Sequence, residues 1–276
     1  MRNYKQMNAI EKLVNQNNDN KFICVGLDTD FEKLPWQIKS SANPVLNFNK
    51  VIIDSTSEYC AAYKVNFAFY EKDGEEGLKI LSETIRYIPS NILIIADAKR
   101  GDIGNTSRMY AKSVFEHYNC DAATLNPLMG KDSLEPFLDY TDKLNFILAL
   151  TSNKGANDFE KLKLDNGKFF YQQIIEKVKE WNLNNNCGIV FGATNSKELK
   201  ENINSFGTLP VLLPGIGAQG GSLEDVINSF KSVNRRSFLI NVSRGIIYKS
   251  SGEDFAEKAR EEILSLNNQI DKILNL

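Results

Sequence analysis

The sequence has little of what most metal sites and nucleophilic triads need. Among its 276 residues there is one histidine, His117, which lies in an amphipathic segment and suits a packing or surface role. A lone histidine argues against a histidine-rich metal site and against a Ser-His-Asp triad. The four cysteines, at positions 24, 60, 120 and 187, are far apart in the chain. We expect buried, reduced thiols rather than a disulfide framework or a zinc site.

Long apolar runs and an excess of charge of one sign are also missing. No run approaches the roughly 18 apolar residues of a membrane span, and residues 1–16 are polar, unlike a signal peptide. The net charge is −2, which gives no global field to attract nucleic acid or anionic membranes. We therefore expect a cytoplasmic protein that binds neither, and any phosphorylated ligand must be held by a local pocket.

Eight short apolar or β-branched runs are spaced along the chain, and segments with helical periodicity lie between most of them. The expected strands are residues 22–27, 61–65, 92–97, 122–126, 146–150, 188–192, 211–214 and 238–242. The clearest helical segments are residues 45–58, 77–87, 106–118 and 170–181.

This alternation predicts an α/β fold with parallel strands and right-handed crossovers. Eight such units close into a TIM (β/α)8 barrel, whose active site lies at the C-terminal ends of the strands. A doubly wound open sheet is the alternative. No Pro-rich or Ser-rich hinge interrupts the chain, so residues 1–276 are interpreted as a single barrel domain. The Asn-rich stretches 15–20 and 182–186 are interpreted as surface turns, and the irregular segment 153–168 as a candidate lid.

The third expected strand runs directly into a dense cluster of opposite charges. Residues 94–106 read Ile-Ile-Ala-Asp-Ala-Lys-Arg-Gly-Asp-Ile-Gly-Asn-Thr. Side chains two apart on a strand share a face, so Asp97 and Lys99 can point together into the barrel mouth. For an isolated Asp-x-Lys, a pair of solvated charges at a strand end is the simpler interpretation.

The two strands before it also carry charge at the same end. Lys64 interrupts an apolar strand, where a buried lysine is costly unless it is paired, and Asp28 follows the first strand. Adjacent parallel strands then bring Lys64, Asp97 and Lys99 into one small space. Three successive strands with charge at one end are not expected of solvated strand ends, so we predict a charged active site.

In combination these motifs resemble the orotidine 5′-phosphate decarboxylases. Asp97-x-Lys99-x-x-Asp102-Ile-x-x-Thr106, with Lys64 on the preceding strand, is similar to the signature of that family, in the form of its longer bacterial members. Further similar motifs follow in the family's order along almost the whole chain: Val25-Gly-Leu-Asp28, Lys64-Val-Asn66, Leu125-Asn-Pro127, Thr151-Ser-Asn153, Gly215-Ile-Gly-Ala-Gln-Gly-Gly221 and Asn241-Val-Ser-Arg244. The resemblance implies a barrel of the ribulose-phosphate-binding type.

The resemblance also implies a reaction: decarboxylation of orotidine 5′-monophosphate at C6 to UMP, the last step of de novo pyrimidine nucleotide biosynthesis. The electrons left on C6 have no conjugated sink, so an enzyme without a cofactor must stabilise them electrostatically and deliver a proton. By resemblance, Lys99 is the cation beside C6 and the proton donor. Asp97 lies near the departing carboxylate, and Lys64 and Asp102 complete the charged network. Carboxylates on either side favour the charged form of Lys99.

A homodimer follows from the resemblance alone. In the family, the residues that match Asp102, Ile103 and Thr106 reach into the partner subunit's site. The implied catalytic unit is therefore two chains with shared active sites.

Other matched positions imply the contacts to the rest of the substrate. Loops after the seventh and eighth strands of such barrels commonly form a phosphate site, and the resemblance assigns the phosphate to Gln219 and Arg244. It assigns the ribose hydroxyls to Asp28 and the pyrimidine to Ser152. The whole expected substrate-binding set is Asp28, Ile103, Thr106, Ser152, Pro214, Gly217, Gln219, Ser243 and Arg244.

The stretch Gly215-Ile-Gly217-Ala-Gln-Gly220 also matches the dinucleotide pattern G-x-G-x-x-G. That pattern should follow the first strand of a βαβ unit and have an acidic residue about 20 positions on. Here it follows the seventh expected strand, and the next strand ends in Asn241-Val-Ser243 without an acid. We expect no NAD and no other cofactor.

Two other functions remain open. A metal-dependent sugar-phosphate decarboxylase or hexulose-phosphate synthase carries the same Asp-x-Lys-x-x-Asp motif, but those relatives typically place an acidic metal ligand where this chain has Lys64. A lysine there repels a metal, so no metal site is expected. A non-catalytic nucleotide-binding barrel would bind UMP without turnover, yet a pure binder gains nothing from burying four charges.

Overall fold

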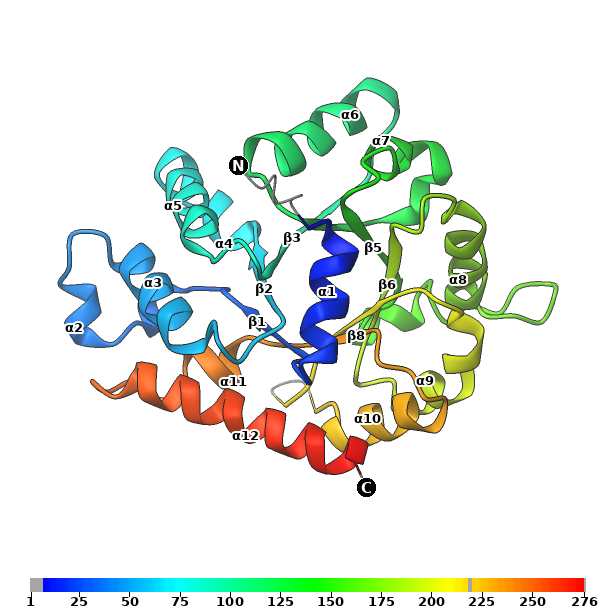
Figure 1. Cartoon of the computed structure of the whole chain (residues 1–276). Coiled ribbons are helices and arrows are strands. Elements are labelled where there is room, and N and C mark those ends of the chain that lie inside the picture. Colours follow the sequence, from blue (N-terminus) through cyan, green and yellow to red (C-terminus); the bar gives the residue numbers. More distant parts are fainter. Residues whose placement is uncertain (1–6, 218–219, 276) are drawn as a thin grey trace, which may run out of the picture.

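Eight parallel strands close into a barrel in chain order, as predicted (Figure 1). The computed structural model describes residues 7–217 and 220–275. The strands are β1 Ile23–Gly26, β2 Ala62–Asn66, β3 Leu93–Arg100, β4 Ala122–Leu125, β5 Leu144–Leu150, β6 Cys187–Phe191, β7 Val211–Pro214 and β8 Phe238–Val242. The (β/α)8 barrel is confirmed and the doubly wound sheet is excluded, because β1 pairs with β8 as well as with β2.

Helices surround the barrel and cover its outer face (Figure 1). The longer ones are α3 Pro44–Thr56, α5 Gly74–Tyr87, α6 Gly104–Lys112, α8 Phe170–Trp181, α9 Ser196–Asn202, α10 Leu223–Ser232 and α12 Phe255–Asn275. The short ones are α2 Trp36–Lys39, α4 Ala68–Glu71, α7 Glu135–Leu138 and α11 Arg244–Ile247, and the π-helical turn Ser113–His117 continues α6. Within the described ranges, no helix is both long and apolar enough to cross a membrane.

The amphipathic pattern of these helices explains their placement. Along α5, Leu81 and Ile85 are buried against the barrel, while Glu75 and Glu76 occupy the first turn, where negative charge complements the helix dipole. The apolar stripe and the charged end together fix which face of the helix packs inward.

Alternation along the strands divides the core into two layers. One set of side chains, including Cys24, Leu93, Ile95 and Phe146, fills the barrel interior. The other set points outward and packs beneath the helices. All four cysteines are buried and unbonded, as expected, and burial raises the pKa of the Cys60 and Cys187 thiols to about 12.

Helix α1, Ala9–Asn18, covers the N-terminal end of the barrel, and Figure 1 shows it lying across the barrel centre. Ala9 and Leu13 pack against the interior layer, and the buried Lys12 Nζ lies 2.7 Å and 2.8 Å from the two carboxylate oxygens of Asp121. The interpretation of residues 15–20 as a surface turn was wrong up to Asn18, because this helix continues that far. With α1 at one end, the cavity described below lies at the other.

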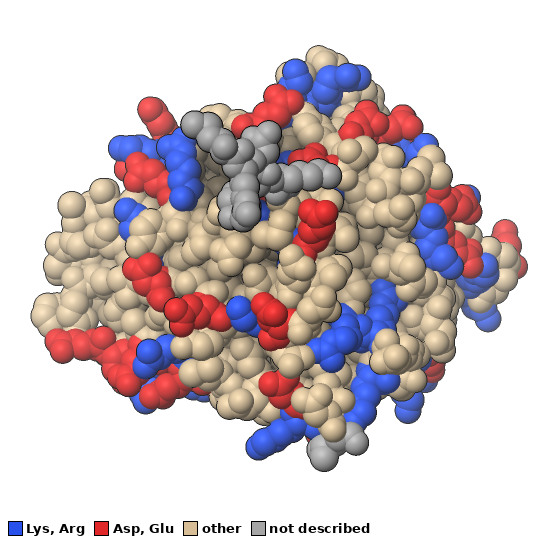
Figure 2. Space-filling view, viewed as in Figure 1, with Lys and Arg blue, Asp and Glu red and all other residues tan. Residues whose placement is uncertain are grey.

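Acidic and basic side chains are interspersed on the face seen in Figure 2, which is the face that carries α1. This mixture agrees with the net charge of −2.

Candidate active site

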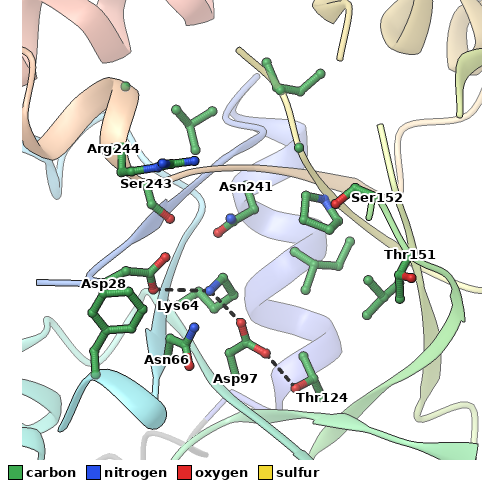
Figure 3. Close-up of a pocket in the computed structure, with 18 of the residues that line it drawn as sticks. Asp28, Lys64, Asn66, Asp97, Thr124, Thr151, Ser152, Asn241, Ser243 and Arg244 are labelled. Atoms are coloured by element: carbon green, nitrogen blue, oxygen red, sulfur yellow. Dashed lines mark hydrogen bonds and ion pairs between the residues drawn. The ribbon is translucent and has the colours of Figure 1, made fainter. Parts of the chain in front are cut away.

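A cavity of about 510 Å³ lies at the C-terminal ends of the strands, which is where a (β/α)8 barrel carries its active site. Figure 3 shows its arrangement: Ser243 and Arg244 lie to one side, Thr151 and Ser152 to the other, and a row of polar side chains runs between them. The predicted residues that line it are Asp28, Lys64, Asp97, Lys99, Ser152, Pro214, Ser243 and Arg244.

Lys64 lies at the centre of the charged row. Its Nζ is 2.7 Å from Asp97 Oδ2 and 3.5 Å from Asp28 Oδ1, and its side chain is only 6% exposed (Figure 3). Burial by itself lowers the pKa of Lys64, but the charges of Asp97 and Asp28 outweigh burial and hold that pKa above its ordinary value. The prediction that this buried lysine is paired is confirmed.

Asp97 accepts from both lysines. Its Oδ1 is 2.6 Å from Lys99 Nζ, while its Oδ2 faces Lys64. Burial raises the pKa of Asp97, yet Lys64 and Lys99 together lower it further than burial raises it, so the carboxyl is held well below its ordinary value. The row Asp28, Lys64, Asp97, Lys99 therefore alternates in residue type, and the shifted pKa values of its two central members keep Lys64 protonated and Asp97 ionised at neutral pH.

Lys99 stands on an irregular part of β3. Ala96 pairs with Ala123 on β4, whereas Arg100 pairs with Leu125, so β3 bulges between these two pairs. Lys99 itself has a φ of 47°, in the left-handed region that non-glycine residues seldom adopt. Its side chain is half exposed, unlike those of Lys64 and Asp97. The bulge thus presents the Lys99 ammonium to the cavity.

Among the cavity residues that were not predicted, Thr124 and Tyr248 make notable hydrogen bonds. Thr124, in the middle of β4, donates to Asp97 Oδ1 at 3.0 Å. The Tyr248 hydroxyl accepts the N–H of Asp30 at 2.6 Å and so connects the loop after β1 to the segment after α11. A threonine within an apolar strand is ordinary in any sheet, but Tyr248 lies one helical turn beyond Arg244 and could have been found from that spacing.

The loops after β7 and β8 form the side of the cavity where the sequence places a phosphate. Arg244 opens α11 and Ser243 precedes it. A Cβ at position 26 would collide with the Ser243 hydroxyl, so the glycine of β1 is what lets this side chain approach. The cavity wall continues through Pro214, Gly215 and Ile216, but Gly217 does not line it, and Gln219 lies outside the described residues.

Ser152 follows β5 on the opposite side, and its neighbour Thr151 is held by a carboxylate. Glu160 Oε2 accepts the N–H of Thr151 at 2.6 Å, and Glu160 Oε1 lies 2.9 Å from the Thr151 hydroxyl. Further along the same segment, Lys163 pairs with Phe169. Segment 153–168 is thus hydrogen-bonded to the end of β5 through Glu160, and its second half forms an antiparallel bridge with Phe169.

The predicted residues Asp102, Ile103 and Thr106 lie outside the cavity of this chain. Asp102 accepts only the N–H of Ile103, at 2.8 Å, among the hydrogen bonds within the described ranges. Ile103 is 59% exposed, and Thr106 is also exposed. These three residues therefore lie on the surface of the chain, away from its own charged row.

In residues 7–217 and 220–275, no three His, Cys, Asp or Glu side chains come close enough together to hold a metal ion. Within the row itself, the Lys64 ammonium stands between the two carboxylates that it contacts. A cation between Asp28 and Asp97 is thus supplied by the chain's own lysine.

A closed barrel with a row of alternating charges in a cavity at the C-terminal ends of its strands is the architecture of a β/α-barrel enzyme. The family model described as the orotidine 5′-phosphate decarboxylase / HUMPS family matches residues 21–259. The chain belongs to this family.

Proteins that carry the name orotidine 5′-phosphate decarboxylase are similar to this chain over nearly its whole length. It is 45% identical over 269 residues to an orotidine 5′-phosphate decarboxylase of Dehalococcoides mccartyi, covering 96% of this chain and 98% of that protein. It is 49% identical over 252 residues to the protein of that name from Christiangramia forsetii, covering 90% and 92%.

Solved structures share the barrel. The Leishmania donovani OMP decarboxylase superposes with a TM-score of 0.84 at 37% identity, covering 98% of this chain and 100% of that one. The enzyme from Methanocaldococcus jannaschii, solved with the inhibitor BMP, gives a TM-score of 0.65 at 25% identity over 90% of this chain and 99% of that one.

Proposed function

We propose that this chain decarboxylates orotidine 5′-monophosphate to UMP and CO₂, as the last step of de novo pyrimidine nucleotide synthesis, with no metal or cofactor. The observation that carries the proposal is the row Asp28, Lys64, Asp97, Lys99, which provides fixed charges of alternating sign beside an open cavity. The relatives named as orotidine 5′-phosphate decarboxylases support the choice of substrate. We further propose that the single barrel is the whole catalytic domain and that it works in the cytoplasm.

In the proposed mechanism Lys99 is the residue that acts on C6. When the C6 carboxylate leaves as CO₂, an electron pair remains on C6, and the Lys99 ammonium stabilises it and then donates a proton to it. The product is UMP, and Lys99 regains its proton from water. Asp97 stays ionised throughout because Lys64 and Lys99 lower its pKa. Since the charges are in place before the substrate binds, little reorganisation is needed during the reaction.

The remaining cavity residues would orient the nucleotide. Arg244, with Ser243 beside it, offers a fork of donors to the phosphate, together with Gln219 from outside the described ranges. Asp28 would accept from the ribose hydroxyls and Ser152 would contact the pyrimidine. Pro214 and Gly217 would shape the loop around the phosphate.

The decisive experiment uses purified protein from which metals have been removed by exhaustive chelation. We expect spectroscopic depletion of orotidine 5′-monophosphate at an undiminished rate. Loss of turnover that Mg²⁺ restores would instead favour a metal-dependent sugar-phosphate decarboxylase or hexulose-phosphate synthase. Tight UMP binding without turnover would favour a non-catalytic nucleotide-binding barrel.

We propose further that two chains form each catalytic unit. Several exposed apolar side chains lie just before α6, on α6 and on the turn after β4: Ile103, Met109, Tyr110, Leu128 and Met129. A patch of this kind suits a second copy of the chain. Asp102, Ile103 and Thr106 would then enter the partner's cavity.

Mixing two inactive variants tests this arrangement. In a heterodimer of a Lys99→Ala chain and an Asp102→Ala chain, each site carries one of the two changes if Asp102 acts within its own chain. If Asp102 crosses over, both changes fall in the same site. In the shared arrangement, a heterodimer has one intact site, so we expect the mixture to regain up to about a quarter of wild-type activity. No recovery after subunit exchange, or a monomer fully active at high dilution, would contradict the shared site.

A further inference from the structure

Thr124 makes two contacts with the charged row through one hydroxyl group. Its Oγ1 lies 3.0 Å from Asp97 Oδ1 and also 3.0 Å from the backbone nitrogen of Lys99. The residue is 2% exposed and lines the cavity, at the point where Figure 3 shows the row Asp28, Lys64, Asp97 ending on β4.

The direction of both hydrogen bonds is fixed by the partners. The Lys99 nitrogen can only donate, so Thr124 Oγ1 accepts there. Asp97 is ionised and can only accept, so the single hydroxyl proton of Thr124 must point to Asp97 Oδ1. The hydroxyl therefore has one orientation, and its two hydrogen bonds link the Lys99 backbone to the Asp97 carboxylate.

The bulge in β3 explains why this hydroxyl is needed. Between Ala96 and Arg100 the regular backbone pairing with β4 is interrupted. The Lys99 N–H lies in this interruption, where a buried N–H still needs an acceptor. Thr124 supplies that acceptor from its side chain. The same contact holds Lys99 in its left-handed conformation, from which its ammonium reaches Asp97 Oδ1 at 2.6 Å.

We infer that Thr124 is a positioning residue for the decarboxylation: its hydroxyl fixes both the backbone of Lys99 and the rotamer of Asp97. This inference rests on the proposed function for its kinetic consequence. Thr124 does not act on the substrate itself. It sets the distance between the proton donor and the carboxylate beside it, and a displacement of about 1 Å at reacting groups can cost a hundredfold in rate.

The test compares Thr124→Val, which keeps the shape and removes the hydroxyl, with Thr124→Ser, which keeps the hydroxyl. We expect Thr124→Val to lower kcat by about 10- to 100-fold, and Thr124→Ser to stay within about threefold of wild type. The dissociation constant for UMP should change by less than about twofold in both, because the groups proposed to hold the nucleotide lie elsewhere in the cavity.

Thr56→Val is the matched control for the loss of a buried threonine hydroxyl. Thr56 Oγ1 bonds within α3 and to Tyr63, away from the cavity. We expect this variant to lose stability but to keep its kcat. Equal damage from Thr124→Val and Thr124→Ser would overturn the inference, as would an unchanged kcat in Thr124→Val or a parallel loss of UMP binding.

Crystal structures of the two Thr124 variants make the inference independent of the reaction. We expect the Asp97 carboxylate or the Lys99 backbone to move in Thr124→Val and to stay in place in Thr124→Ser. Unmoved groups in Thr124→Val would overturn the positioning role. A wild-type protein that leaves orotidine 5′-monophosphate intact would instead overturn the proposed function, and these structures would still decide the role of Thr124.

Discussion

At the scale of single residues, Lys99 and Lys64 perform different tasks although both are lysines paired with Asp97. The Lys64 side chain is 6% exposed and bonded to two carboxylates, whereas the Lys99 side chain is 50% exposed and extends from a bulge. The buried lysine bridges two carboxylates, whereas the more exposed one bonds only Asp97 among the ion pairs of the described residues and lines the cavity.

Replacement of Lys99 by alanine should abolish activity and preserve the fold. We expect kcat to fall by at least about a thousandfold, because the proposed proton donor is removed, while Asp97 keeps its bonds to Lys64 and Thr124. The assay is UMP formation, with circular dichroism for folding. Lys177→Ala is the control, since Lys177 is similarly exposed and paired to Glu180 at 2.7 Å. Wild-type-like turnover in Lys99→Ala would refute the assignment of the proton donor.

The pKa shifts of the row predict how stability depends on pH. The pKa of Asp97 is lowered in the folded protein, so its contribution is present above the ordinary carboxyl value of 3.8 and is lost as the pH falls toward the folded value. The pKa of Lys64 is raised, so its contribution is present below 10.5 and is lost as the pH rises through the folded value.

Urea denaturation of wild type and Asp97→Asn, from roughly pH 3 to pH 8, measures the acid side of this dependence. We expect wild type to lose stability relative to the variant as the pH falls below about 4, and the difference to be flat from pH 5 upward. Asp73→Asn, a change at an exposed carboxylate, should follow wild type. A difference that varies between pH 5 and pH 8 would contradict the lowered pKa of Asp97.

At the scale of elements, the segment after β5 is anchored rather than free. Glu160 binds the N–H and hydroxyl of Thr151, and the Glu160 carbonyl accepts the N–H of Tyr171 at the start of α8. This places Glu160 between the strand end that carries Ser152 and the helix that follows. Ser152 should therefore depend on Glu160 for its position.

Glu160→Ala tests that dependence. Loss of a charge-assisted bond to a backbone N–H costs about 1.5–3 kcal/mol, so we expect the KM for the nucleotide to rise by about tenfold or more while kcat changes less. Glu176→Ala is the matched control. Glu176 binds Lys168 at 2.6 Å, so its replacement loosens the same segment at a point away from Thr151. Equal effects of both variants would show that closure of the whole segment matters, rather than this one anchor.

The elements also show where sequence reasoning succeeded and failed. The strands were predictable because each is a compact apolar run, and the charges at the ends of the first three were informative because a parallel barrel brings such ends together. Helix α1 was missed because several of its buried positions are polar, among them Lys12 and Gln16, which leaves no apolar period. Thr124 and Glu160 were missed because their roles depend on a bulge and on a contact between segments, which no local pattern encodes.

At the scale of the whole molecule, α1 and the cavity lie at opposite ends of the barrel. The N-terminal end is covered by Ala9 and Leu13 and by the buried pair of Lys12 and Asp121. The C-terminal end carries the cavity, where the strands stop and the loops begin. One end of the barrel is therefore closed by packed side chains, and the other end carries the charged cavity.

The alternating row has a consequence for how the ligand arrives. The cavity lining holds three carboxylates, Asp28, Asp30 and Asp97, against four cations, Lys33, Lys64, Lys99 and Arg244, which leaves a sum of +1. An Asp102 supplied by a second copy would bring that sum to zero. A nearly neutral mouth gives little long-range steering, so recognition of a phosphorylated anion depends on contact at short range.

Ionic strength should therefore have a small effect on capture. Between roughly 10 mM and 150 mM salt we expect kcat/KM to fall by less than about threefold, whereas a strongly steered association falls by tenfold or more. Stopped-flow measurement of nucleotide binding over this range checks the expectation, and a steep salt dependence would contradict it. The cancellation of charge within the cavity would thus make the capture of a phosphorylated ligand largely indifferent to the salt around it.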